Sequence, residues 1–144
     1  MSTSILFADD SPAVRRAIRS VLTSELGSSI VCIEAGDGEE ALSKAIAAQP
    51  DIVVLDIAMP GLNGLETARY IKQHCPKSAV LAISSYDLEA VIPRLTYGIS
   101  GFVRKDAMGS DLLPAIQALL QGKTYFTYQL AADSRVRTTS ARLT

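Results

Sequence analysis

Residues 52–56 read Ile52-Val53-Val54-Leu55-Asp56, four β-rich apolar residues that run directly into a carboxylate. A strand that is apolar on both faces is typical of a parallel sheet covered by helices on each side. Helix-length segments separate this run from three others, and the alternation predicts an α/β fold with a parallel sheet. The other apolar runs also end in polar or charged residues: 5–8 leads into Asp9-Asp10, 80–83 into Ser84, and 101–104 into Lys105.

The polar residues that follow these strands are expected to converge. The carboxyl ends of parallel strands lie at one edge of the sheet, and ligands bind outside that edge. Carboxylate oxygens suit a hard divalent cation, and an ammonium compensates the charge of a phosphoryl group. The pattern therefore predicts a site for phosphoryl chemistry built from Asp9, Asp10, Asp56, Ser84 and Lys105.

Local signals predict where the helices begin. Ser11-Pro12 is a typical helix start with proline in the first turn, and Asp37 is positioned to cap a second helix. Ser110 is expected to cap the last helix, which would place Pro114 in its first turn. A helix is also expected over 88–97, kinked or shortened by Pro93.

The composition fits one globular domain. The chain has 144 residues, of which 48% are hydrophobic, so it is long enough to bury one sizeable core. Its formal net charge of -1 excludes the basic excess that is typical of nucleic-acid-binding domains. No apolar stretch approaches the roughly 20 residues that span a bilayer, and we expect a cytoplasmic protein without a membrane partner. Cys32 and Cys75 are expected to be reduced, structural thiols.

Four motifs in order resemble the receiver domain of response regulators, the phosphoacceptor half of two-component signalling. They are Asp9-Asp10, the stretch from Asp56 to Glu66, Ser84, and the stretch from Gly101 to Asp106. The resemblance implies a flavodoxin-like, doubly wound sheet of five parallel strands in the order 2-1-3-4-5, with five helices. It covers residues 1–128, whereas 129–144 is polar and is expected to be a linker or tail.

The resemblance also implies the reaction. Asp56 would accept a phosphoryl group from the phosphohistidine of a sensor histidine kinase. The cofactor would be Mg²⁺ or Mn²⁺, held by Asp9, Asp10, Asp56 and the backbone carbonyl of Ala58. Such a domain is a phosphoacceptor that assists its own phosphorylation and dephosphorylation, and it is not otherwise an enzyme.

Three further residues match family positions that respond to the phosphate. Lys105 and Ser84 would contact phosphoryl oxygens, and Phe102 would be the aromatic switch residue that turns inward. Taken singly, these residues also have ordinary explanations: a solvated loop lysine, a turn serine and a core phenylalanine. The acidic pair alone is likewise explained by helix capping through Asp10.

Two other protein families fit the sequence less well. A phosphatase of the haloacid-dehalogenase kind needs a second carboxylate two residues after the nucleophile, where this chain has Ala58. A flavin-binding module needs a hydroxyl- and glycine-rich phosphate loop, whereas residues 9–12 would repel phosphate unless a metal ion lay between them. His74 is expected to have a surface or capping role, and Arg15, Arg16 and Arg19 to form the solvent face of the first helix, with a kinase contact as the alternative.

The segments 111–116 and 122–126 are similar to receivers of the NarL/FixJ type, which precede a LuxR-type helix-turn-helix domain. Leu143-Thr144 resembles the start of such a domain, so we expect the native gene to continue and DNA contact to occur only through that C-terminal domain. Phosphorylation would then favour a homodimer. A stand-alone receiver that acts through protein contacts is the alternative. Two features depart from the family pattern: the interval 84–98 is short, and Pro93 interrupts the predicted fourth helix. Signal output through the face of that helix is therefore the least supported part of the assignment.

Overall fold

The computed structural model describes residues 2–58, 64–85, 98–129 and 135–140. The predicted helix at 88–97, with Pro93, lies outside these residues. The described elements are β1 (Thr3–Ala8), α1 (Pro12–Leu26), β2 (Ile30–Ala35), α2 (Gly38–Ala48), β3 (Ile52–Asp56), α3 (Gly64–His74), β4 (Ala79–Ser84), β5 (Ile99–Arg104), α5 (Met108–Leu120), β6 (Thr124–Gln129) and β7 (Arg135–Ser140), with short 3-10 turns at Gly27–Ser29 and Lys105–Ala107.

All strands belong to one sheet in the order β2-β1-β3-β4-β5-β6-β7. The first five strands are parallel and follow the predicted order 2-1-3-4-5. The predicted total of five strands was wrong, because β6 adds a sixth parallel strand beside β5 and β7 pairs antiparallel with β6. Four α-helices lie within the described residues, against five predicted.

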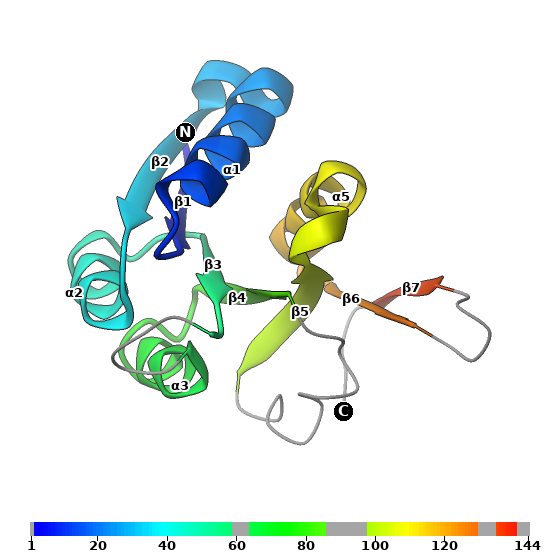
Figure 1. The fold of residues 1–144 in the computed structure, drawn as a ribbon. Helices are drawn as coiled ribbons and strands as arrows, with labels where there is room; N and C mark the ends of the chain where they lie inside the picture. Colours follow the sequence, from blue (N-terminus) through cyan, green and yellow to red (C-terminus); the bar gives the residue numbers. More distant parts are fainter. Residues whose placement is uncertain (1, 59–63, 86–97, 130–134, 141–144) are drawn as a thin grey trace.

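Helices cover both faces of the sheet. Figure 1 shows α1 and α5 on one face and α2 and α3 on the other. Side chains alternate along each strand, so Ile5 and Phe7 of β1 pack toward α1 and α5, whereas Leu6 and Ala8 pack toward α2 and α3. The uninterrupted apolar sequence of β3 is explained by burial on both faces, since all five of its residues are buried.

The first two helix starts agree with the sequence prediction. The Ser11 hydroxyl accepts a hydrogen bond from the Val14 amide at 3.3 Å, and Asp37 Oδ1 accepts one from the Glu40 amide at 2.8 Å. These side chains satisfy amide groups that a helix N-terminus leaves without a partner.

The predicted start of the last helix was wrong. Helix α5 begins at Met108, and its N-cap, Ala107, makes no side-chain capping bond. Ser110 lies inside the helix, where its hydroxyl donates to the Ala107 carbonyl at 3.2 Å. Pro114 is therefore within the helix rather than in its first turn. The 3-10 turn that follows β5 runs directly into α5, so the helix needs no polar side chain to start it.

Part of the C-terminal region that was expected to be a linker or tail forms a strand. Arg135–Ser140 forms β7, whose register with β6 runs from Thr124 opposite Ser140 to Gln129 opposite Arg135. The division of the chain into a domain and a linker stays a prediction, because backbone pairing alone does not mark a domain boundary. No helix in the described part of the chain is long and apolar enough to cross a bilayer.

Candidate functional site

The carboxyl ends of β1, β3 and β5 bring together the acidic residues and the lysine. Ala8 lies opposite Leu55 in the register of β1 and β3, which places Asp9 and Asp56 on adjacent strand ends. Lys105 follows the last residue of β5. The structure thus assembles Asp9, Asp10, Asp56 and Lys105 at one edge of the sheet, as the sequence pattern predicted.

Asp56 ends β3 and is 2% exposed. One carboxylate oxygen, Oδ1, accepts a hydrogen bond from the Ala58 amide at 2.9 Å, and the other, Oδ2, accepts one from Lys105 Nζ at 2.9 Å. The Ile57 amide donates to the Ile83 carbonyl at 3.1 Å and so holds the start of the following loop against β4. These contacts fix the orientation of a nearly buried carboxylate.

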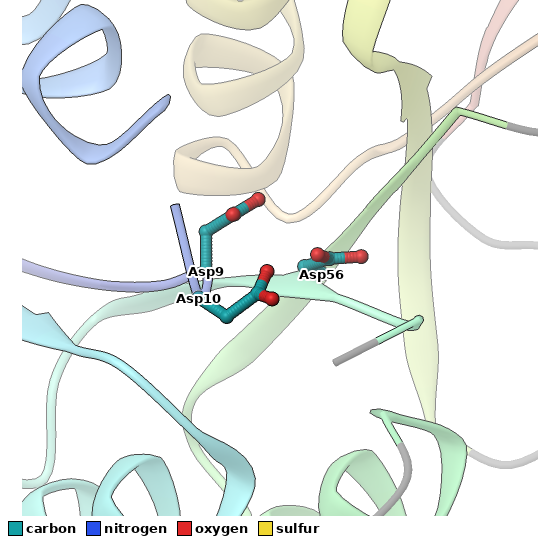
Figure 2. A group of neighbouring side chains, drawn as sticks. All are labelled: Asp9, Asp10 and Asp56. Carbon is teal, nitrogen blue, oxygen red and sulfur yellow. The ribbon is translucent and has the colours of Figure 1, made fainter. Parts of the chain in front are cut away.

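Asp9 is fully buried, whereas Asp10 is exposed. Asp9 Oδ1 accepts a hydrogen bond from the Ser11 amide at 2.9 Å. Asp9 Oδ2 lies 2.7 Å from Lys105 Nζ in an ion pair, although the angles are not those of a good hydrogen bond. Figure 2 shows the carboxylate of Asp10 directed toward that of Asp56, with both aspartates of the pair coming from the end of β1.

Lys105 is the cation shared by the two buried carboxylates, at 2.7 Å from Asp9 Oδ2 and 2.9 Å from Asp56 Oδ2. Burial by itself would lower the pKa of this lysine. The close contacts with Asp9 and Asp56 and their negative charges outweigh that desolvation, and the pKa of Lys105 is raised above its ordinary value. The lysine is therefore not the solvated loop residue of the alternative interpretation.

The acidic residues fit a divalent cation. One carboxylate oxygen each from Asp9, Asp10 and Asp56 lie within 4.8 Å of one another. Oxygens on opposite sides of a bound Mg²⁺ are roughly 4 Å apart, so a small side-chain movement would allow all three to ligate one ion. Asp9 Oδ2, which is buried without a well-formed hydrogen bond, is a suitable ligand because a cation would satisfy it.

Helix capping does not explain the acidic pair. Ser11, not Asp10, provides the side-chain cap of α1. Asp10 makes no hydrogen bond or ion pair with any residue in the described ranges. An exposed carboxylate held beside two buried ones carries an electrostatic cost that a bound cation would remove.

The remaining predicted site residues lie close to this edge. Ser84 is the last residue of β4, is fully buried, and pairs in register with Arg104 of β5. Phe102 is also fully buried and belongs to the core cluster on the α2 and α3 face. Ala58 is exposed just after β3, and its amide contacts Asp56.

Arg15 was expected on the solvent face of the first helix and was not predicted to contact the site. Its Nη1 donates to the backbone carbonyl of Asp9 at 2.6 Å, and its Nε pairs with Glu34 Oε1 at 3.1 Å. A signal for this contact exists in the sequence: Arg15 is one helical turn after the Ser11 cap, and helix side chains lean toward the N-terminus. Arg19 also contacts Glu34, at 2.7 Å, so the arginine row is only partly solvated.

Residues outside the site behave as structural groups. His74 Nδ1 lies 2.9 Å from the Tyr70 carbonyl at the end of α3, in agreement with the predicted capping role. Both cysteines are free thiols. Burial raises the pKa of Cys75, and it likewise raises the pKa of Cys32, so both thiols are disfavoured as thiolates.

Comparison with known proteins gives a family match over most of the chain. The family model described as the response regulator receiver domain matches residues 5–117. The transcriptional activator protein ExaE of Pseudomonas putida is 36% identical over 130 residues, which are 90% of this chain and 60% of that protein. The transcriptional regulatory protein YxjL of Bacillus subtilis (strain 168), itself uncharacterized, is 31% identical over 129 residues, 89% of this chain and 59% of that protein. The chain thus spans about three fifths of the length of these relatives.

Solved structures give the same result. A LuxR-family two-component response regulator from Aurantimonas sp. SI85-9A1 has a TM-score of 0.75 and 32% identity, with 85% of this chain and 87% of that chain covered. The isolated receiver domain of RcsB from Salmonella enterica serovar Typhimurium, solved with the phosphomimetic BeF3-, has a TM-score of 0.77 and 27% identity, with 88% and 94% covered.

Proposed function

Since the chain belongs to the response regulator receiver family of NarL/LuxR-type regulators, we propose that it accepts a phosphoryl group on Asp56 from the phosphohistidine of a sensor histidine kinase. The observation that carries the proposal is the position of Asp56 at the end of β3, within contact of Lys105 and beside Asp9 and Asp10. In this proposal the chain is a phosphoacceptor that assists its own phosphorylation and dephosphorylation and is not otherwise an enzyme.

The reaction requires a short sequence of bond changes. A carboxylate oxygen of Asp56 attacks phosphorus, a P–O bond forms, and the P–N bond of the phosphohistidine breaks. The imidazole nitrogen leaves with the electron pair and gains a proton. When bound, Mg²⁺ or Mn²⁺ supplies charge neutralisation for the carboxylates and the phosphoryl oxygens. Asp9, Asp10, Asp56 and the Ala58 carbonyl would hold it.

Lys105 has a second role in the proposal. In the structure its ammonium is shared between Asp9 and Asp56. On phosphorylation the new phosphoryl oxygens would compete for this ammonium, since a phosphoryl group carries more negative charge than a carboxylate. Ser84 would donate its hydroxyl to another phosphoryl oxygen, and Phe102 would respond as the switch residue. The fully buried position of both side chains means that a change at one is felt by its packed neighbours.

The output that we propose is control of transcription through a LuxR-type DNA-binding domain that follows the receiver domain. Support comes from ExaE and YxjL, which are named as transcriptional regulators and are longer than the region they share with this chain. Phosphorylation would favour a homodimer of the full protein. A stand-alone receiver acting by protein–protein contacts remains the second candidate, and the coding sequence of the native gene distinguishes the two.

The test is phosphorylation by acetyl phosphate with Mg²⁺, followed by intact-mass measurement. The wild type and the Asp106→Asn control, which alters an exposed aspartate at the same edge, should each gain one base-labile phosphoryl group. Asp56→Asn, or the wild type in EDTA, should gain none. Equal phosphorylation of Asp56→Asn and the wild type would refute the assignment.

A second measurement separates accepting the phosphate from responding to it. Ser84→Ala should still be phosphorylated, because transfer depends on positioning and charge neutralisation, but its amide chemical-shift changes along β4 and β5 should be reduced. A normal spectral response in phosphorylated Ser84→Ala would remove Ser84 from the proposed switch.

A further inference from the structure

The backbone carbonyl of Asp9 is held by a side chain from α1. Arg15 Nη1 donates to this oxygen at 2.6 Å, while Arg15 Nε donates to Glu34 Oε1 at 3.1 Å. The arginine side chain is 21% exposed, so most of it is packed against its neighbours. One planar guanidinium therefore connects the loop after β1 with the end of β2.

This carbonyl belongs to the peptide bond that joins Asp9 to Asp10. Because a peptide unit is planar, holding its oxygen also fixes the direction in which the chain continues into Asp10. The Asp9 carboxylate has contacts of its own, with the Ser11 amide and Lys105. The carboxylate of Asp10 is exposed and makes no hydrogen bond or ion pair within the described ranges, so the contacts that place this residue are those of its backbone.

Glu34 keeps the guanidinium in place. It lies near the end of β2, opposite Phe7 in the register of β1 and β2. Its second oxygen pairs with Arg19, and Lys44 Nζ donates to its backbone carbonyl at 2.7 Å. Glu34 is thus held from two helices, its carboxylate by α1 and its backbone carbonyl by α2. The rigid fork of Arg15 uses separate nitrogens for Glu34 and for Asp9.

We propose that Arg15 is a positioning residue for the metal side of the site: by holding the Asp9–Asp10 peptide, it aims the Asp10 carboxylate at the cation position shared with Asp9 and Asp56. The inference rests on the proposed function, because it assumes that the acidic cluster holds a divalent cation. It assigns Arg15 no contact with the phosphoryl group or the kinase.

The competing explanation is that Arg15 serves only to tie α1 to β2. Arg19 provides the matched control, since it lies one turn later on the same helix and pairs with the same Glu34. Its guanidinium also lies 5.7 Å from the centre of the Phe7 ring, but within the described chain it makes no hydrogen bond to Asp9. A purely structural role predicts similar effects from both arginines.

The experiment measures Mn²⁺ binding to the unphosphorylated protein by electron paramagnetic resonance, together with thermal stability. Loss of a group that orients a metal ligand typically weakens metal affinity about 10-fold or more. We therefore expect Arg15→Gln to bind Mn²⁺ about 10-fold more weakly than the wild type. Arg19→Gln should bind Mn²⁺ with an affinity within about two-fold of the wild type, because Arg19 does not hold the Asp9–Asp10 peptide. Arg15→Lys should recover part of the affinity, since an ammonium reaches the carbonyl but lacks the fork.

Phosphorylation by acetyl phosphate gives an independent measurement. Arg15→Gln should need a higher Mg²⁺ concentration for half-maximal rate, yet approach the wild-type rate at saturating Mg²⁺. Unchanged Mn²⁺ affinity in Arg15→Gln, or an equal loss in both glutamine variants, would overturn the inference. If the wild type is phosphorylated on Asp56 but Arg15→Gln binds Mn²⁺ normally, this inference is refuted and the proposed function stands. Mn²⁺ binding that depends on Arg15, in a protein that acetyl phosphate does not modify, upholds the positioning role and refutes the proposed function.

Discussion

At Lys105, one ammonium serves two carboxylates that have almost no contact with water. Asp9 is 0% exposed and Asp56 is 2% exposed. Removing one partner of a buried ion pair is costly because the remaining charge stays in a medium of low polarity. The same site would gain positive charge from a bound divalent cation, so the lysine and the cation should partly substitute for each other.

We therefore expect Lys105→Ala to lower the free energy of unfolding by about 2 kcal/mol in EDTA, less than for a fully enclosed pair because Lys105 is partly exposed. In saturating Mg²⁺ the loss should be smaller, since the cation compensates the two carboxylates. Urea denaturation with and without Mg²⁺ measures both values. Lys123→Ala, at an exposed position, is the control. An equal loss in both buffers would contradict the idea that the ammonium and the cation balance the same charges.

At the scale of elements, a charged cluster ties α1 to β2. Glu34 on β2 pairs with both Arg15 and Arg19 of α1. The hydrogen bond from Arg19 is the largest cause that lowers the pKa of Glu34, and the charge of Arg19 and the contacts of Arg15 lower it further. A carboxyl with a lowered pKa in the folded state stabilises the fold above its unfolded pKa and loses this contribution as the pH falls through its folded pKa.

The free energy of unfolding should accordingly fall less on acidification in Glu34→Gln than in the wild type, over the range from about pH 5 to pH 3. The difference should stay below about 1 kcal/mol because the pair is substantially exposed to solvent. Chemical denaturation at several pH values measures it. Glu25→Gln, at an exposed position of α1, is the control and should lose stability on acidification as the wild type does. An identical slope for Glu34→Gln would show that these ion pairs do not contribute.

The start of α3 lies against the strand that carries Asp56. A Cβ atom added to Gly64 would lie 2.1 Å from the Ile57 Cα and 2.7 Å from the Asp56 carbonyl oxygen. These are backbone atoms, which cannot turn aside as a flexible side chain would. The close approach of helix and strand therefore requires glycine at this position.

Gly64→Ala should destabilise the protein by about 3 kcal/mol, the upper end of the usual cost of overpacking, and should slow phosphorylation because Ile57 and Asp56 are displaced. Gly109→Ala is the matched control: it lies in α5, where an added Cβ meets nothing within 4 Å. That variant should be more stable by about 0.5 kcal/mol, since alanine loses less conformational entropy in a helix. Thermal denaturation of both variants tests the pair, and similar effects of the two changes would argue against the packing explanation.

How well each element could be predicted depends on whether its cause is local. Ser11 and Asp37 cap helices through contacts within one turn, so their roles are visible in the sequence. The start of α5 was misplaced because it continues from a 3-10 turn and has no polar cap. Strand β6 exists because α5 returns the chain beside β5, where Gly101 and Phe102 pair with Tyr125 and Phe126, a tertiary cause that no local pattern shows.

The candidate site follows the same rule. Strand ends identify Asp9, Asp10, Asp56 and Lys105, because parallel topology alone brings them to one edge. The hydrogen bond from Arg15 to the Asp9 carbonyl depends on how α1 leans over β1, and the residue type alone indicated a solvent face. The sequence also predicted that Lys105 would act once phosphate is present, whereas the structure already pairs it with two carboxylates.

At the scale of the whole molecule, the net charge of the chain argues against direct contact with DNA. The net charge of the chain is -1, so it has no excess of positive charge to attract nucleic acid. We expect no sequence-specific DNA binding by this chain at moderate salt, with or without phosphorylation. Fluorescence anisotropy with a labelled promoter and a scrambled control measures this. Tight, specific binding would place a DNA-reading surface within these residues and contradict the proposed division of labour.

The ion pairs of Lys105 also set a condition on synthesis. Asp9 is made early, and the ammonium that neutralises it and Asp56 comes 49 residues after Asp56 along the chain. A growing polypeptide therefore lacks the ammonium that pairs with both carboxylates until the residue after β5 has been made, and the arrangement of the first five strands around Asp56 cannot be completed before then. We expect a nascent chain that ends before β5 to be unable to receive phosphate. In the proposed function, phosphorylation on Asp56 would therefore wait until five of the seven strands have been translated.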